Sequence, residues 1–259
     1  MTKSKVAEEI AGKDIQKEAA HFDEVWRKVR PTKVTDELPI PGAPSLADKR
    51  VLICSCGSGR DPVRAANSGA QVFAVDLSPA GVHKAQEMAT LNRVSIDARV
   101  IDLHHLDFPD EYFDVLYGSA ILHHLNCDTA GAEFRRVLKR GGIGFFEDEN
   151  TDRNPILGFF YRAMSGTDAN GNFKKYWFAK RIGTTNERMF CRQDLEALRK
   201  YFPNAEARTD SFMFFQKLSH VADMRGIGLT QAMDRLTEIG IPAVRRHSYE
   251  QDIWFSKQI

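Results

Sequence analysis

The chain has 259 residues, of which 42% are hydrophobic and 27% are charged, and its formal net charge is +1. This composition is that of an ordinary globular protein, which argues against disorder, and the nearly neutral charge gives no general attraction to nucleic acid or anionic membranes. Residues 1–22 lack the apolar core of a signal peptide, and no segment approaches the roughly 20 apolar residues of a membrane span. We therefore expect a cytoplasmic protein with no integral membrane association and no nucleic-acid partner.

The apolar runs alternate with helical patterns along the chain. Residues Lys5 to Arg30 read as a helix, and a proline-rich loop follows up to residue 50. We then expect five strands at 50–55, 71–77, 98–103, 113–120 and 142–148, with helices between them at 62–69, 78–92 and 130–140. This alternation predicts a doubly wound α/β fold, in which helices cover both faces of a mostly parallel sheet.

The cysteine content indicates neither disulfides nor a metal. The four cysteines are scattered, and Cys54-x-Cys56 lacks the spacing of a zinc knuckle. We read Cys54 and Cys56 as small buried residues and expect no metal site.

The turn "SCGSGRDP", residues 55–62, follows the first strand and precedes a helix. In doubly wound sheets ligands bind at the carboxyl ends of the strands, and Gly57 and Gly59 would let the backbone approach a ligand there. Such a turn also occurs with no ligand, so it is weak evidence alone. The second strand ends in Asp76, however, where a carboxylate can accept hydrogen bonds from two ribose hydroxyls. Asp76 could instead cap the next helix, although Ser78 already suits that role.

Two kinds of nucleoside cofactor fit a glycine turn followed by a ribose-binding acid. A nicotinamide dinucleotide needs the fingerprint G-x-G-x-x-G, and the third glycine is missing here. Asp61, at the helix start, would repel a pyrophosphate but could help to hold the ammonium of a methionine moiety. The third strand likewise ends in Asp102, which could accept from the exocyclic amine of adenine or could be a solvated loop acid. These details favour S-adenosylmethionine.

The residues resemble class I S-adenosylmethionine-dependent methyltransferases, especially the branch that acts on small molecules. The resemblance rests on "VLICSCGSGR", "VFAVDLSP", "VIDLHHLDFPDEYFDVLYGSAILHHL" and "EFRRVLKRGGIGFFEDEN" in order between residues 50 and 150. It implies a Rossmann-like sheet with an antiparallel C-terminal edge strand in residues 248–259. It also implies a cofactor site in which the glycine turn passes the methionine and ribose, and which consists of Ser55, Gly57, Gly59, Asp61, Asp76, Leu77, Asp102, Leu103 and Ser119. Leu77 would pack on adenine, Asp102 with Leu103 would flank the adenine edge, and Ser119 would line the sulfonium side.

The sequence departs from the family pattern at two positions. The family usually has an acid at the position of Ile53 and a glycine at that of Ser55. Because the missing carboxylate normally helps to anchor the methionine end, we expect Asp61 to take over this role.

Three residues are candidates for the chemistry. His123 and His124 follow the fourth strand, where either could serve as the base for a hydroxyl or activated-carbon acceptor, or could only shape the loop. Glu147, Asp148 and Glu149 end the fifth strand, and Glu147 could face the acceptor or belong to a solvated acidic loop. We expect O-methylation of a small, aromatic or lipid-like molecule first and C-methylation second.

We expect a single domain, 1–259. It would consist of an N-terminal helical segment and loop (1–48), a cofactor-binding core (49–150), a lid that sets acceptor specificity (151–215) and C-terminal elements (216–259). Two alternatives remain open at this point: a non-catalytic S-adenosylmethionine-binding module and an NAD-dependent oxidoreductase.

Overall fold

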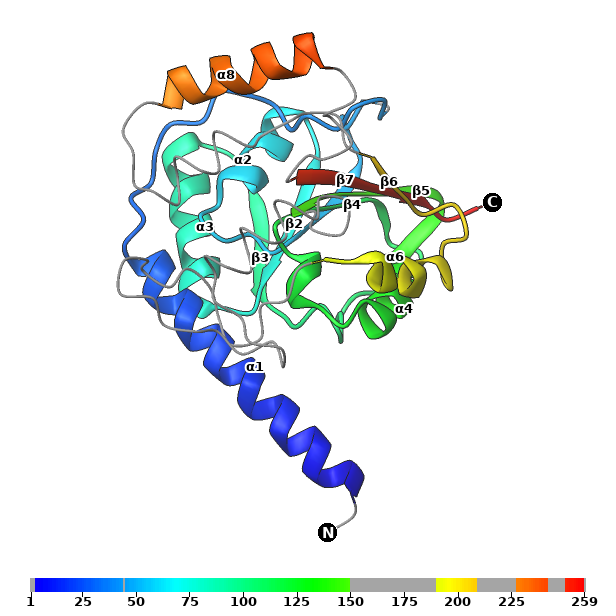
Figure 1. The fold of residues 1–259 in the computed structure, drawn as a ribbon. Helices are drawn as coiled ribbons and strands as arrows, with labels where there is room; N and C mark the ends of the chain where they lie inside the picture. Colours follow the sequence, from blue (N-terminus) through cyan, green and yellow to red (C-terminus); the bar gives the residue numbers. More distant parts are fainter. Residues whose placement is uncertain (1–2, 44, 150–189, 209–226, 242–249, 259) are drawn as a thin grey trace, which may run out of the picture.

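The computed structural model describes residues 3–43, 45–149, 190–208, 227–241 and 250–258. A seven-stranded sheet forms the centre, with helices packed on both of its faces (Figure 1). The helices are α1 (Lys3–Arg27), α2 (Arg60–Asn67), α3 (Pro79–Asn92), the 3₁₀ helix η1 (Leu122–His124), α4 (Cys127–Val137), α6 (Arg192–Arg199) and α8 (Ile227–Gly240). The strands are β1 (Arg50–Cys54), β2 (Gln71–Asp76), β3 (Ile96–Val100), β4 (Phe113–Ser119), β5 (Leu138–Glu149), β6 (Glu206–Arg208) and β7 (Glu250–Ser256).

The strand order is β3-β2-β1-β4-β5-β7-β6. The first five strands are parallel, and β7 runs antiparallel to both β5 and β6. This confirms the doubly wound α/β fold and the antiparallel C-terminal strand. The expectation that this strand forms the edge is wrong, because β6 pairs with its outer side through Glu206 and Trp254.

The register of the parallel strands brings their carboxyl ends to one edge of the sheet. Cys54 of β1 lies beside Val75 of β2 on one side and beside Gly118 of β4 on the other. The residues that follow, Ser55 and Asp76 among them, therefore share this edge, which is where doubly wound sheets bind ligands.

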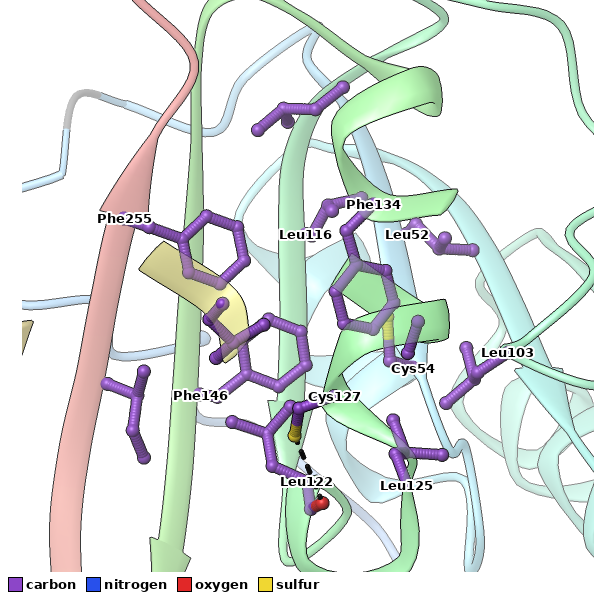
Figure 2. Packing of buried hydrophobic residues seen from close by; sticks show 14 of the residues in the cluster. Leu52, Cys54, Leu103, Leu116, Leu122, Leu125, Cys127, Phe134, Phe146 and Phe255 are labelled. Carbon is purple, nitrogen blue, oxygen red and sulfur yellow. Dashed lines mark hydrogen bonds between the residues drawn. The ribbon is translucent and has the colours of Figure 1, made fainter. Parts of the chain in front are cut away.

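Two apolar clusters hold the helices against the sheet. On one face Phe134 of α4 stacks on Phe146 of β5, with ring centroids 5.4 Å apart, in a cluster that also contains Leu116 and Cys54 (Figure 2). On the other face Ile53, Tyr117 and Phe145 pack beneath α2 and α3. Because side chains alternate along a strand, β1, β4 and β5 each contribute to both clusters.

Most predicted bounds agree with the structure within two or three residues. β3 spans Ile96–Val100 rather than 98–103, because the chain turns at Asp102, whose carboxylate accepts from the backbone N–H of His104. α4 ends at Val137 rather than at 140, since Leu138 already pairs with Phe113 as the first residue of β5. Residues 151–189 and 209–215 of the predicted lid lie outside the described residues. Among the described helices, none is long and apolar enough to cross a membrane.

Candidate functional site

The turn after β1 follows a left-handed path. Ser55, Gly57 and Gly59 have φ of 69°, 44° and 84°. A non-glycine residue in this region costs about 1–3 kcal/mol, so the backbone of Ser55 is strained. Its Oγ lies 3.5 Å from Asp76 Oδ2, which ties the turn to the end of β2.

The two glycines of the turn have different roles. A Cβ on Gly59 would lie 2.5 Å from the Cα of Ala85, so this glycine allows α2 and α3 to pack closely. A Cβ on Gly57 would lie 2.9 Å from Cζ2 of Trp26, an α1 residue. The Cβ position of Gly57 thus faces α1, and that of Gly59 faces α3.

Asp76 lies at the centre of this edge. Its Oδ2 accepts from the backbone N–H of Gly57 at 2.8 Å and its Oδ1 accepts from that of Ser78 at 2.9 Å. The residue is only 6% exposed. Burial raises the pKa of Asp76, and the N–H groups of Ser78 and Gly57 offset only part of this effect. Ser78 itself caps α3 by accepting from the N–H of Gly81, so Asp76 is not the cap.

Asp102 is held by a neighbouring histidine. Its Oδ1 lies 2.7 Å from Nδ1 of His104, and His104 Nε2 accepts from the backbone N–H of Asn126 at 3.0 Å. Burial raises the pKa of Asp102, but the hydrogen bonds from His104 outweigh it and lower the pKa overall. Leu103 points into the apolar core beside Leu125, so its contribution to the edge is limited (Figure 2).

Ile53, where the resemblance leads one to expect an acid, is part of an apolar cluster. Ile53 is 1% exposed and pairs in register with Tyr117 of β4. The Tyr117 hydroxyl donates to Glu147 Oε2 at 2.6 Å, and Asp61 Oδ1 lies 3.1 Å from Nη1 of Arg64. The pKa of Tyr117 is raised by burial and by the charges of Asp61 and Glu147, so both carboxylates act on this tyrosine.

His123 and His124 each lie beside a carboxylate, and their rings are in contact at a tilt of 40°. His123 Nδ1 lies 2.6 Å from Asp148 Oδ1, and its backbone N–H donates to Asp148 Oδ2 at 3.1 Å. His124 Nδ1 lies 2.6 Å from Glu18 Oε1 of α1. The imidazole rings are 4.1 Å apart between centroids.

Glu147 and Asp148 are neighbours on β5 and therefore point to opposite faces of the sheet. Asp148 is hydrogen bonded to His123, and Glu147 accepts a hydrogen bond from Tyr117. Two of the remaining predicted residues, Leu77 and Ser119, are half-buried at the ends of β2 and β4.

Sequence reasoning missed the residues that α1 contributes to this edge. Glu18, Phe22 and Trp26 recur every four residues, the spacing of one helix face. The spacing predicts that these three residues share one face of the helix, but no local pattern predicts which part of the molecule this face contacts.

Comparison with known proteins agrees with this geometry. Residues 52–146 match the family described as "Methyltransferase domain". The chain is 31% identical over 117 residues to the 27-O-demethylrifamycin SV methyltransferase of Amycolatopsis mediterranei (strain S699), a match that covers 43% of this chain and 42% of that protein. The chain thus spans less than half the length of this relative.

Two solved structures share the fold. The geranyl diphosphate C-methyltransferase of Streptomyces coelicolor A3(2) has a TM-score of 0.58 at 13% identity, over 95% of this chain and 98% of that one. The [4+2]-cyclase SpnF has a TM-score of 0.55 at 18% identity, over 93% of this chain and 94% of that one.

The cofactor of the matched family is S-adenosylmethionine. The ordered motifs, the sheet order and the family match together show that residues 52–146 are similar to methyltransferase domains that use S-adenosylmethionine.

Proposed function

We propose that this protein transfers the methyl group of S-adenosylmethionine to an oxygen atom of a small molecule. The observation that carries the proposal is the buried carboxylate of Asp76 at the end of β2, hydrogen bonded to the turn at Gly57. The pKa of Asp76 is raised because the hydrogen bonds to its carboxylate do not fully offset the cost of burying the charge. The carboxylate already accepts from Gly57 and Ser78, and two ribose hydroxyls would add further donors, so the chemistry of this position fits the cofactor.

At the methionine end, the proposal assigns the ammonium group to Asp61. The related proteins use an acid at the position of Ile53, and here that position is apolar and buried. Asp61 lies in the first turn of α2, and its charge reaches Tyr117, the register partner of Ile53. Arg64 pairs with both Asp61 and Asp36. Asp36 can therefore keep Arg64 while Asp61 binds the ammonium group.

For the base, the geometry favours His123 with Asp148 over Glu147. Asp148 holds the ring proton of His123 on Nδ1, which leaves the lone pair on Nε2. When bound, S-adenosylmethionine would supply an electrophilic methyl group for the acceptor oxygen, with its sulfur as the leaving group. We assign to His123 Nε2 the hydroxyl proton that the acceptor loses. His124, whose ring contacts that of His123 and which pairs with Glu18, is the second candidate.

The acceptor class is the least constrained part of the proposal. The relative from Amycolatopsis is named for methylation at an oxygen, which favours oxygen over carbon. The aromatic segments between residues 151 and 189 suit an aromatic or lipid-like acceptor, and they lie outside the described residues.

The proposal is tested by product formation. The full chain is incubated with S-adenosylmethionine and a panel of phenols, naphthols and 27-O-demethylrifamycin SV, and the release of S-adenosylhomocysteine is measured with mass analysis of the acceptor. We expect an O-methylated product from at least one acceptor. Asp148→Asn should lower kcat by about 100-fold, the usual size of a general-base contribution, and Glu147→Gln should lower it far less. The reverse order of the two variants would move the base to Glu147.

A second candidate function is a cofactor-binding module without methyl transfer. The observation in its favour is Ile53, which removes the acid that anchors the methionine end in related proteins. Binding of S-adenosylhomocysteine combined with no methylated product across the whole panel would favour this candidate.

A further inference from the structure

One face of α1 covers the carboxyl edge of the sheet. Glu18 pairs with His124, and Phe22 contacts both His124 and Trp26, with ring centroids 5.5 and 6.1 Å away. Trp26 lies one turn further along, against the glycine turn. The last turns of this helix run beside α3, while its N-terminal half projects from the body of the molecule (Figure 1).

The indole of Trp26 lies over the proposed ribose position. A Cβ on Gly57 would be 2.9 Å from its Cζ2, and a Cβ on Gly81 would be 3.0 Å from its Cδ1. The carboxyl carbon of Asp76 is 3.1 Å from that same position at Gly81. The ring thus extends from the first turn of α3 to the glycine turn, and it covers the carboxylate that two ribose hydroxyls would need to reach.

A separate contact fastens α1 in this position. Asp23 Oδ1 accepts from the hydroxyl of Ser78 at 2.5 Å and from the backbone N–H of Ala80 at 3.0 Å. Both donors belong to the start of α3, where the helix dipole also favours a carboxylate. Hydrogen bonds from Ser78 and Ala80 lower the pKa of Asp23, so the contact is formed at neutral pH.

We propose that Trp26 is an internal stand-in for the nucleoside of the cofactor, and that S-adenosylmethionine binds only after the indole leaves the ribose position. This inference rests on the proposed cofactor site. The aromatic ring covers Gly57 and Asp76, and Asp23 with Glu18 holds the helix that carries it. The apparent cofactor affinity is then the intrinsic affinity multiplied by the fraction of molecules in which Trp26 is displaced.

The test is the affinity for S-adenosylhomocysteine, measured by calorimetry on the full chain. Because a competing side chain is removed, Trp26→Ala should bind roughly threefold or more tightly than wild type. Asp23→Ala should also bind more tightly, since it releases α1 and leaves the indole intact. Glu24→Ala is the matched control, because Glu24 lies on the exposed side of the same helix and pairs only with Lys28 among the described residues. Its affinity should equal that of wild type.

A second readout follows the indole directly. Saturation with S-adenosylhomocysteine should shift tryptophan emission to longer wavelength as Trp26 enters water, and Trp26→Phe should abolish the shift although Trp177 and Trp254 remain. Weaker or unchanged binding by Trp26→Ala, or no shift in a wild-type protein that binds the ligand, would overturn the inference. If neither wild type nor Trp26→Ala binds S-adenosylhomocysteine, the proposed cofactor site itself fails.

Discussion

Asp76 combines burial with two backbone donors, and this sets the pH range in which the proposed site can bind its ligand. Because burial raises the pKa of this carboxyl, a proton competes with the ribose hydroxyls at a higher pH than for an ordinary Asp, whose pKa is about 3.9. The raised pKa of Asp76 also adds to the free energy of unfolding of the ligand-free protein. This added stability is fully present below the ordinary pKa of Asp and is lost as the pH rises through the raised pKa.

We therefore expect the affinity for S-adenosylhomocysteine to fall on acidification while most exposed carboxylates are still ionised. Calorimetric titrations between pH 7.5 and 4.5 measure this, with circular dichroism to show that the protein stays folded. Asp102 serves as the internal comparison, because its lowered pKa keeps it ionised through the same range. A constant affinity over this range would contradict the role of Asp76.

Asp61 offers a second test at the level of one residue. If it holds the methionine ammonium in place of the acid missing at Ile53, Asp61→Ala should weaken S-adenosylhomocysteine binding about tenfold, the loss of one charge-assisted hydrogen bond. Asp36→Ala is the matched control, because it removes the other partner of Arg64. Equal affinities of Asp61→Ala and wild type would refute the assignment.

At the level of elements, the fit of α2 against α3 depends on Gly59. An alanine there would be strained by its φ of 84° and would also meet the backbone of Ala85 at 2.5 Å. Gly42 provides the control, because its φ is 71° and a Cβ there has no neighbour within 4 Å.

Gly42→Ala should cost only the conformational penalty of about 1–2 kcal/mol, and Gly59→Ala should cost about 1–3 kcal/mol more because of overpacking. Urea unfolding of the two variants measures both values. Equal losses would show that the α2–α3 contact yields without strain.

The elements from β1 to β5 and the glycine turn could be predicted from the sequence, because strand and helix periods and a turn glycine are local signals. Asp76 could be predicted for the same reason, since it ends an apolar strand. The outer position of β6 could not, because a three-residue strand carries almost no pattern. The sequence prediction named Glu147 and not Asp148 as a candidate, because the sequence does not show which face of β5 meets His123.

For the whole molecule, the contribution of α1 could not be anticipated. Residues 18–26 are separated by 31 to 106 positions from the residues they cover, and the packing of α1 along α3 brings them together. The site thus consists of the glycine turn, which the local sequence predicts, and of α1, which is distant in the sequence. If Trp26 must move for the cofactor to bind, ligand binding is coupled to the packing of α1.

The central claim is that the carboxyl edge around Asp76 binds S-adenosylmethionine. The most direct test is calorimetric titration of the full chain with S-adenosylhomocysteine and, separately, with NADH, using wild type and Asp76→Ala. We predict micromolar binding of S-adenosylhomocysteine by wild type, loss of that binding in Asp76→Ala, and no binding of NADH. Wild type that binds NADH, or that binds S-adenosylhomocysteine no better than Asp76→Ala does, would contradict the claim.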